Sequence, residues 1–160
     1  MSETLLARIT TFAAESNTKA VPLRKGETLV EVDQANIKIF ISHLLNDLAL
    51  RHLATITGLD LGQNLGITYH FIQGQETIHV RTSVPKTNPA ALSIVDLIPG
   101  AILYEMEIHD MFGVTFTGNP WINRKLLLPD DWPADLPPPL LKTSKPAEIR
   151  KRLGLETAQK

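Results

Sequence analysis

The sequence predicts an α+β fold in which two helices lie on one face of a mainly antiparallel or mixed β-sheet. Three observations lead to this prediction. Apolar residues recur at helical spacing in residues 5–13, they do so again in residues 37–50, and the apolar period changes to two residues beyond Arg51. The predicted order is α-β-β-α-β-β-β in a two-layer α/β sandwich, followed by a helix and an extended, proline-rich C-terminal arm.

The first three elements follow from local spacing. Ile9 and Phe12 belong to the apolar face of the first helix, and Ser2 is a candidate for its N-cap. Residues 19–32 have the pattern of a β-hairpin that turns at Lys25-Gly26.

The second helix and three strands complete the predicted sandwich. Asp33 is the candidate cap of this helix, and its apolar stripe continues to about Leu50. Alternating apolar and polar residues then predict three strands, at 52–58, 67–71 and 77–81. His70 and His79 face each other across the last hairpin, but two imidazoles without a third ligand do not predict a metal site.

Residues 93–112 predict two more helices. Ser93 is positioned to cap a short helix that runs to Ile98, and Pro99-Gly100 interrupts the chain before a helix at about 101–112. We place the domain boundary after this region, with a folded domain at residues 1–128 and the arm at residues 129–160. Six prolines between Pro129 and Pro146 favour extended backbone, and residues 146–154 have the pattern of a short basic helix.

Composition restricts the possible functions. Sixteen basic and seventeen acidic residues give a formal net charge of -1, which does not favour binding to nucleic acid. The absence of cysteine excludes thiolate nucleophiles, disulfides and the usual iron-sulfur ligands. The N-terminal residues lack a signal-peptide pattern and no long apolar run is present, so we expect a soluble, cytoplasmic chain.

The helix at 101–112 has an apolar face and several acids. Glu107 and Asp110 are neighbours at i, i+3, and Glu105 and His109 are neighbours at i, i+4, so we expect an acidic side that points away from the apolar side. Gly113 is suited to the positive φ of a C-cap. Acids in the last turn oppose the helix dipole, which indicates that basic groups meet them.

Four interpretations of these acids remain open at this point. They could form a solvated surface, or pair with Arg124 and Lys125 or with a basic partner. Glu105 and His109 could begin a metal site, although no third ligand is evident. A small stand-alone enzyme or metal-binding domain could use Glu107, His109 and Asp110, although no nucleophile or phosphate-binding loop accompanies them.

The segment from Tyr104 to Trp132 resembles the signature of the thirty-kilodalton subunit family of respiratory complex I, which is the C-type subunit of NADH:quinone oxidoreductases. The same family occurs in energy-converting, membrane-bound nickel-iron hydrogenases. The resemblance extends over about residues 50–132. The signature positions, which we take as candidate interface residues, are Glu105, Glu107, Asp110, Gly113, Phe116, Gly118, Pro120, Arg124, Lys125, Leu128, Pro129 and Trp132.

The sequence departs from the family pattern at several positions. Met106 replaces the arginine between the acids, and Asn119 replaces a histidine. A later motif is degraded to residues 139–143, and the basic pair stands one residue further from the turn than usual. These departures point to a divergent branch, such as the hydrogenase side.

The resemblance implies a structural and assembly subunit that carries no redox centre of its own. Family members dock against the large catalytic-type subunit and neighbouring iron-sulfur subunits, so iron-sulfur clusters, and nickel-iron or quinone, are expected in partners. The resemblance also implies a peripheral position on the inner face of the cell membrane, reached only through the complex. Complex I membership and hydrogenase membership both stay open.

Overall fold

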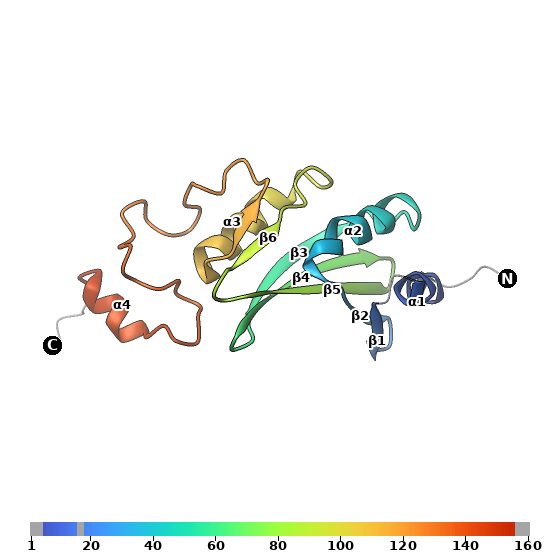
Figure 1. Ribbon diagram of the computed structural model, residues 1–160, viewed down its shortest axis with the longest axis horizontal. Helices are drawn as coiled ribbons and strands as arrows, with labels where there is room; N and C mark the ends of the chain where they lie inside the picture. The colour runs from blue at the N-terminus through green and yellow to red at the C-terminus, as the bar shows by residue number, and fades with distance from the viewer. Residues whose placement is uncertain (1–4, 16–17, 156–160) are drawn as a thin grey trace.

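A five-stranded mixed sheet forms the centre of the computed structural model, which describes residues 5–15 and 18–155 (Figure 1). The strand order is β1-β2-β5-β4-β3, in which β2 and β5 pair in parallel and all other neighbours are antiparallel. The strands are β1 (Lys19–Arg24), β2 (Glu27–Glu31), β3 (Leu53–Asp60), β4 (Asn64–Gln73) and β5 (Glu76–Pro85). The predicted α+β class with a mixed sheet is confirmed.

One face of this sheet is covered by helices. The helices α1 (Leu5–Glu15), α2 (Ile37–Asn46) and α3 (Ala101–Phe112) all contribute residues to the same core cluster. Alternation along the strands supplies the other half of the core, because Ile67, Tyr69 and Val80 point to the covered face and are fully buried. The opposite face carries the intervening residues and has a more polar character.

The second helix is shorter than the apolar stripe predicts. It follows a 3₁₀ turn (Gln34–Asn36) and ends at Asn46 instead of near Leu50. Leu48 and Leu50 are still buried, because Ala49 adopts a left-handed conformation with φ of 55° and turns the chain back toward the core. Asp33 precedes the 3₁₀ turn but makes no side-chain capping bond, and Ser2 lies outside the described residues.

The predicted helix at Ser93–Ile98 is wrong. This segment forms turns, with the amide groups of Leu97 and Ile98 both donating to the carbonyl of Ile94. The Ser93 hydroxyl donates to Glu105 of α3 and accepts a hydrogen bond from the amide of Val95 at 3.2 Å, so it closes a local turn without starting a helix. A small parallel sheet of β6 (Ala90–Leu92) and β7 (Thr115–Thr117) was not predicted either.

Beyond β7 the chain runs through turns and extended segments to α4 (Pro146–Arg152). Pro146 lies in the first turn of α4, and Gly154 has φ of 67° just after its end. This helix lies at the opposite end of the molecule from α1 (Figure 1). No helix among the described residues is both long and apolar enough to cross a membrane.

Candidate functional site

The helix α3 is fixed on the sheet by contacts with β3. The Tyr104 hydroxyl donates a hydrogen bond to the carbonyl of Ala54 at 3.0 Å. Nearer the end of α3, the ring of Phe112 lies against Gly58, where an added Cβ would come within 2.5 Å of two ring carbons. The close approach requires glycine at this position, and it sets how α3 lies along β3.

Glu105 points into the protein. Its Oε2 accepts hydrogen bonds from the Ser93 hydroxyl at 2.8 Å and from Asn119 Nδ2 at 3.0 Å, and its Oε1 accepts one from the amide of Ile94 at 2.8 Å. Burial raises the pKa of this carboxyl, and the three donors oppose that increase. The side chain therefore ties two loops to α3, the one at 93–94 and the one at 119.

Asn119 extends this connection into the next turn. Its Nδ2 also donates to the carbonyl of Ile102 at 3.2 Å, and its Oδ1 accepts from the amide of Trp121 at 2.9 Å. The residue is nearly buried, with an exposed fraction of 5%. The departure from the family histidine at this position is thus accommodated by internal hydrogen bonds.

Asp110 holds the backbone of a leucine-rich loop. Its Oδ2 accepts hydrogen bonds from the amides of Leu126 and Leu127, both at 2.8 Å, and from the amide of Leu128 at 3.2 Å. Lys125 Nζ lies 3.6 Å from Oδ1, which is an ion-pair distance but too long for a hydrogen bond. Burial raises the pKa of Asp110, but the three amide donors and Lys125 together outweigh it and lower the pKa.

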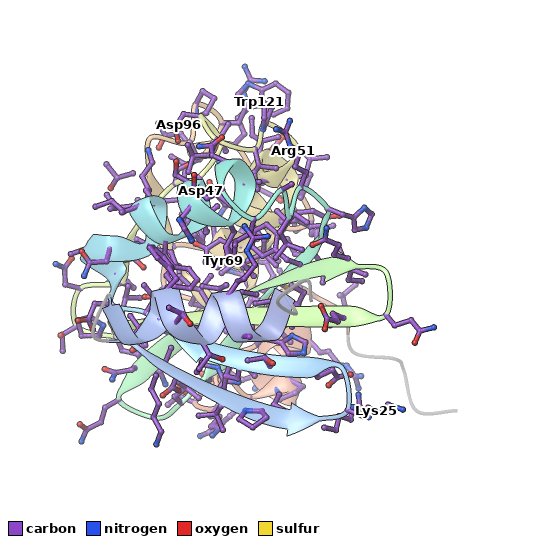
Figure 2. The ribbon with its side chains drawn as sticks, turned by 90° about the vertical axis from the view of Figure 1, so that its right-hand side faces the viewer. Lys25, Asp47, Arg51, Tyr69, Asp96 and Trp121 are labelled. Carbon is purple, nitrogen blue, oxygen red and sulfur yellow. The ribbon has the colours of Figure 1, made fainter. Side chains whose placement is uncertain are left out.

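This loop presents apolar side chains to the outside. Leu127 is 58% exposed, and Leu126 and Trp121 are exposed as well. The Arg124 guanidinium lies 5.6 Å from the centre of the Trp121 ring, in a cation–π arrangement. In the view of Figure 2, Trp121 is at the top, and Lys25, which lies in the turn between β1 and β2, is near the bottom.

The prediction that the acids of α3 point away from its apolar side is therefore wrong for two of the three acids. Glu105 and Asp110 are buried, and only Glu107 is exposed. The reason is that the loops at 93–94 and 119–128 cover parts of α3 that the sheet leaves free. Lys125 does pair with Asp110, as one of the interpretations expected.

The residues that the catalytic and metal hypotheses combine do not form one site, because each has different surroundings. His109 Nδ1 donates to the carbonyl of Val114 at 2.9 Å, Asp110 binds the loop amides, and Glu107 is exposed. Glu105, the proposed ligand partner of His109, is occupied by its three donors. Within residues 5–15 and 18–155, no group of three or more His, Asp and Glu side chains is arranged to hold a metal ion.

The remaining signature positions shape the chain around α3. Gly113 has φ of 79°, as predicted for a C-cap, and its amide donates to the carbonyl of His109. Phe116 is fully buried in β7, and Gly118 turns the chain with φ of 101°. Pro120 and Pro129 are exposed, while Leu128 and Trp132 are half-buried.

The segment beyond Pro129 is fastened to the domain at two points. The amide of Leu140 donates to the carbonyl of Met111 at 3.0 Å, and Pro138 lies beside Gly113. The amide of Lys142 donates to Asp60 Oδ2 at 2.8 Å. The first contact joins the arm to α3 of the signature region, and the second joins it to the end of β3.

Asp60 fastens the arm, a role that the sequence patterns do not predict. Besides Lys142, it accepts hydrogen bonds from Lys86 Nζ at 2.7 Å and from the amide of Gly62 at 2.8 Å. Lys86, Lys142 and Gly62 together lower the pKa of Asp60 to about 2. Its most distant partner lies 82 positions further along the chain, so no local spacing pattern points to it.

Comparison with known proteins identifies the family. The family model of the respiratory-chain NADH dehydrogenase 30 Kd subunit matches residues 30–149. The chain belongs to this family. The matched range includes Glu105 and Asp110, whose hydrogen bonds are described above.

Relatives of this 30 kDa-family chain include C-type subunits of NADH-quinone oxidoreductases. It is 34% identical to that of Roseiflexus castenholzii over 115 residues, which is 68% of this chain and 66% of the relative. It is 40% identical to that of Acidothermus cellulolyticus over 92 residues, 56% of this chain and 45% of the relative. The chain thus spans about half to two-thirds of the length of these relatives.

Solved structures show the same fold. The trypsin-resistant fragment (1–134) of Nqo5 superposes with a TM-score of 0.65 and 24% identity, over 73% of this chain and 98% of that one. A chain of the archaeal membrane-bound sulfane sulfur reductase superposes with a TM-score of 0.82 and 21% identity, over 98% of this chain and 94% of that one. Both comparisons support the α+β fold.

Proposed function

We propose that this chain is a non-redox structural and assembly subunit of a membrane-bound oxidoreductase in the complex I and nickel-iron hydrogenase superfamily. It docks against the large catalytic-type subunit in the peripheral, cytoplasmic arm, and the isolated chain has no catalytic activity. Membership of the 30 kDa family supports this role. The absence of cysteine supports it as well, because the cluster ligands must then come from partners.

The observation that carries the proposal is the loop held by Asp110. A buried carboxylate binds three consecutive amides, while the side chains of Leu126 and Leu127 point outward. Fixing the backbone in advance reduces the entropy lost on binding. The exposed leucines, with the exposed Trp121 earlier in the same segment, supply apolar area for an interface. We infer that this loop and the exposed side of α3, at Leu103 and Glu107, form the docking surface.

The proline-rich segment has a second part in the proposal. Residues 129–160 act as an arm that lies across a neighbouring subunit. Hydrogen bonds to Met111 and Asp60 fasten the arm to the domain. The side chain of Leu140, which belongs to the arm, remains 55% exposed. Prolines restrict the backbone of the arm before it meets a partner.

A paired substitution tests the docking surface. Leu127→Asp puts a charge into the proposed interface, whereas Leu23→Asp puts the same charge on β1 at a similarly exposed leucine, two residues before Lys25. Lys25 lies far from Trp121 in the view of Figure 2. Each tagged variant is purified from gently solubilised membranes of the native host, and the co-purifying large subunit is quantified. We expect recovery to fall at least tenfold for Leu127→Asp and to stay near wild type for Leu23→Asp.

Thermal melting of both purified variants separates docking from folding. Equal melting temperatures with unequal recovery support the surface at Leu127. Undiminished recovery with Leu127→Asp would remove this loop from the interface, whatever complex the chain belongs to.

A further inference from the structure

Two histidines meet on the face of the sheet that the helices do not cover. His70 of β4 and His79 of β5 are directly opposite each other in the antiparallel register. Their Nδ1 atoms are 2.7 Å apart, and the rings are edge to face with centres separated by 4.8 Å. At this distance one Nδ1 carries a hydrogen and the other accepts it.

The pair continues into polar groups on both sides. Thr57 of β3 places its hydroxyl 2.8 Å from His70 Nε2. His79 Nε2 lies 3.7 Å from Glu27 Oε2 of β2, and Arg24 binds that same carboxylate oxygen at 2.8 Å. The line of contacts thus connects β3, β4, β5 and β2 without involving the core.

With both rings neutral, every nitrogen of the pair has a suitable partner. The Thr57 hydroxyl donates to His70 Nε2, His70 Nδ1 donates to His79 Nδ1, and His79 Nε2 carries the hydrogen that faces Glu27. The chain of donors runs in one direction, from β3 toward β2.

One additional proton fits if the direction of donation reverses. His79 becomes the imidazolium beside the Glu27 carboxylate, its Nδ1 donates to His70 Nδ1, and the His70 hydrogen moves to Nε2, from which it donates to Thr57. A second proton does not fit, because both Nδ1 atoms would carry hydrogens and face each other at 2.7 Å. The two rings would also be like charges in contact.

We propose that His70 and His79 form a pH-sensitive clip on the uncovered face of the sheet, which holds one proton and is broken by a second. Uptake of the second proton separates the rings and loosens the β4–β5 hairpin on this face near its turn at Gly74. Since the two sites are strongly coupled, the pair takes up protons in two separate steps.

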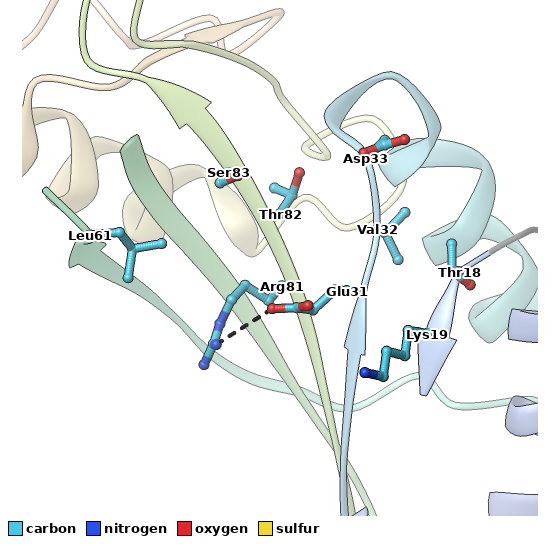
Figure 3. A pocket seen from close by; sticks show the side chains of 9 residues that line it. All are labelled: Thr18, Lys19, Glu31, Val32, Asp33, Leu61, Arg81, Thr82 and Ser83. Carbon is cyan, nitrogen blue, oxygen red and sulfur yellow. Dashed lines mark ion pairs between the residues drawn. The ribbon is translucent and has the colours of Figure 1, made fainter. Parts of the chain in front are cut away.

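The other charges on this face disfavour the uptake of a proton by His70. Arg81 lies two residues beyond His79 on the same face of β5, and it is paired at 3.8 Å with Glu31 of β2 (Figure 3). Burial, the charge of His79 and the charge of Arg81 all lower the pKa of His70. On β3, the uncharged side chain of Thr57 contacts His70. On β2, the carboxylate of Glu27 faces His79.

The sign of the pH dependence follows from the lowered pKa of His70. The unfolded chain binds a proton at this histidine more readily than the folded chain does. The contribution of the clip to stability is therefore complete above a pH of about 6.5 and declines as the pH falls below that value.

Nuclear magnetic resonance titration of the histidine rings in the full chain tests the clip. We expect two transitions for the pair separated by about one pH unit or more, because the two rings share one hydrogen-bonded contact between their Nδ1 atoms. His79→Gln should move the His70 midpoint upward by about one unit, whereas His52→Gln, at an exposed histidine, should leave it in place.

Thr57→Val and hydrogen exchange provide further measurements if His79→Gln fails to fold. Thr57→Val should shift the His70 transition, and exchange of the β4–β5 amides near Gly74 should accelerate as the second step is passed. Independent single transitions at ordinary positions, unchanged by Thr57→Val, would overturn the proposal.

Discussion

Replacement of Asp110 measures how strongly the leucine-rich loop is held. Two hydrogen bonds at 2.8 Å join its buried carboxylate to the amides of Leu126 and Leu127, and a longer one joins it to Leu128. Charge-assisted bonds of this kind contribute about 1.5 kcal/mol or more each, so Asp110→Ala should lower the free energy of unfolding by about 3 kcal/mol. Asp110→Asn keeps a neutral acceptor and should cost about half as much.

Urea unfolding of the purified chain gives these free energies, and amide hydrogen exchange shows where the loss occurs. Exchange at residues 126–128 should accelerate in both variants. Glu107→Ala is the matched control, because this acid is exposed on the same helix and should change stability by no more than about 0.5 kcal/mol. Equal stability of Asp110→Ala and Glu107→Ala, with loop exchange unchanged, would refute the role assigned to Asp110.

Two further predictions concern the contacts that position α3 and the arm. Gly58→Ala drives a methyl group into the Phe112 ring and should destabilise the protein by about 1–3 kcal/mol in urea unfolding, whereas Gly100→Ala, which meets open space, should not. The pKa of Asp60 is lowered from 3.8 to about 2, chiefly by Lys86, so its contribution to stability is complete above pH 4 and is lost as the pH falls toward 2. Asp60→Asn should remove that part of the acid dependence in thermal melting, and an unchanged acid profile would contradict the prediction.

Periodic patterns predicted the core elements well. Ile37, Phe40, Ile41 and Leu44 recur at helical spacing, and all four are buried in α2. Alternation at 67–71 and 77–81 predicted β4 and β5, although both strands extend further, to Asn64–Gln73 and Glu76–Pro85. These patterns are local, because each residue's face depends only on its position within its own element.

The surroundings of the acids could not be predicted in the same way. Glu105 and Asp110 occur on α3 as part of a polar side, and their burial depends on Ser93, Asn119 and the amides of 126–128. These partners lie outside the helix, and no spacing rule connects them to it. The short β6–β7 pair was missed for the same reason, since three-residue strands far apart in the sequence leave little signal.

The resemblance supplied what the periodic patterns could not. It selected Asp110 and Lys125 together as signature positions, and the structure brings them to an ion-pair distance. It did not indicate that the acids bind within the chain instead of facing a partner. The carboxylate of Asp110 is therefore a support for the loop. That the exposed leucines of the loop face a partner is our proposal, which the Leu127→Asp experiment tests.

Mass spectrometry of all proteins that co-purify with the tagged wild-type chain, from gently solubilised membranes of its native host, tests the central proposal most directly. We predict recovery of a large catalytic-type subunit with iron-sulfur subunits. A nickel-iron large subunit would indicate a hydrogenase, and a quinone-site subunit would indicate a complex I-type enzyme. Recovery of the chain alone, from the soluble fraction, would contradict the proposed assembly role.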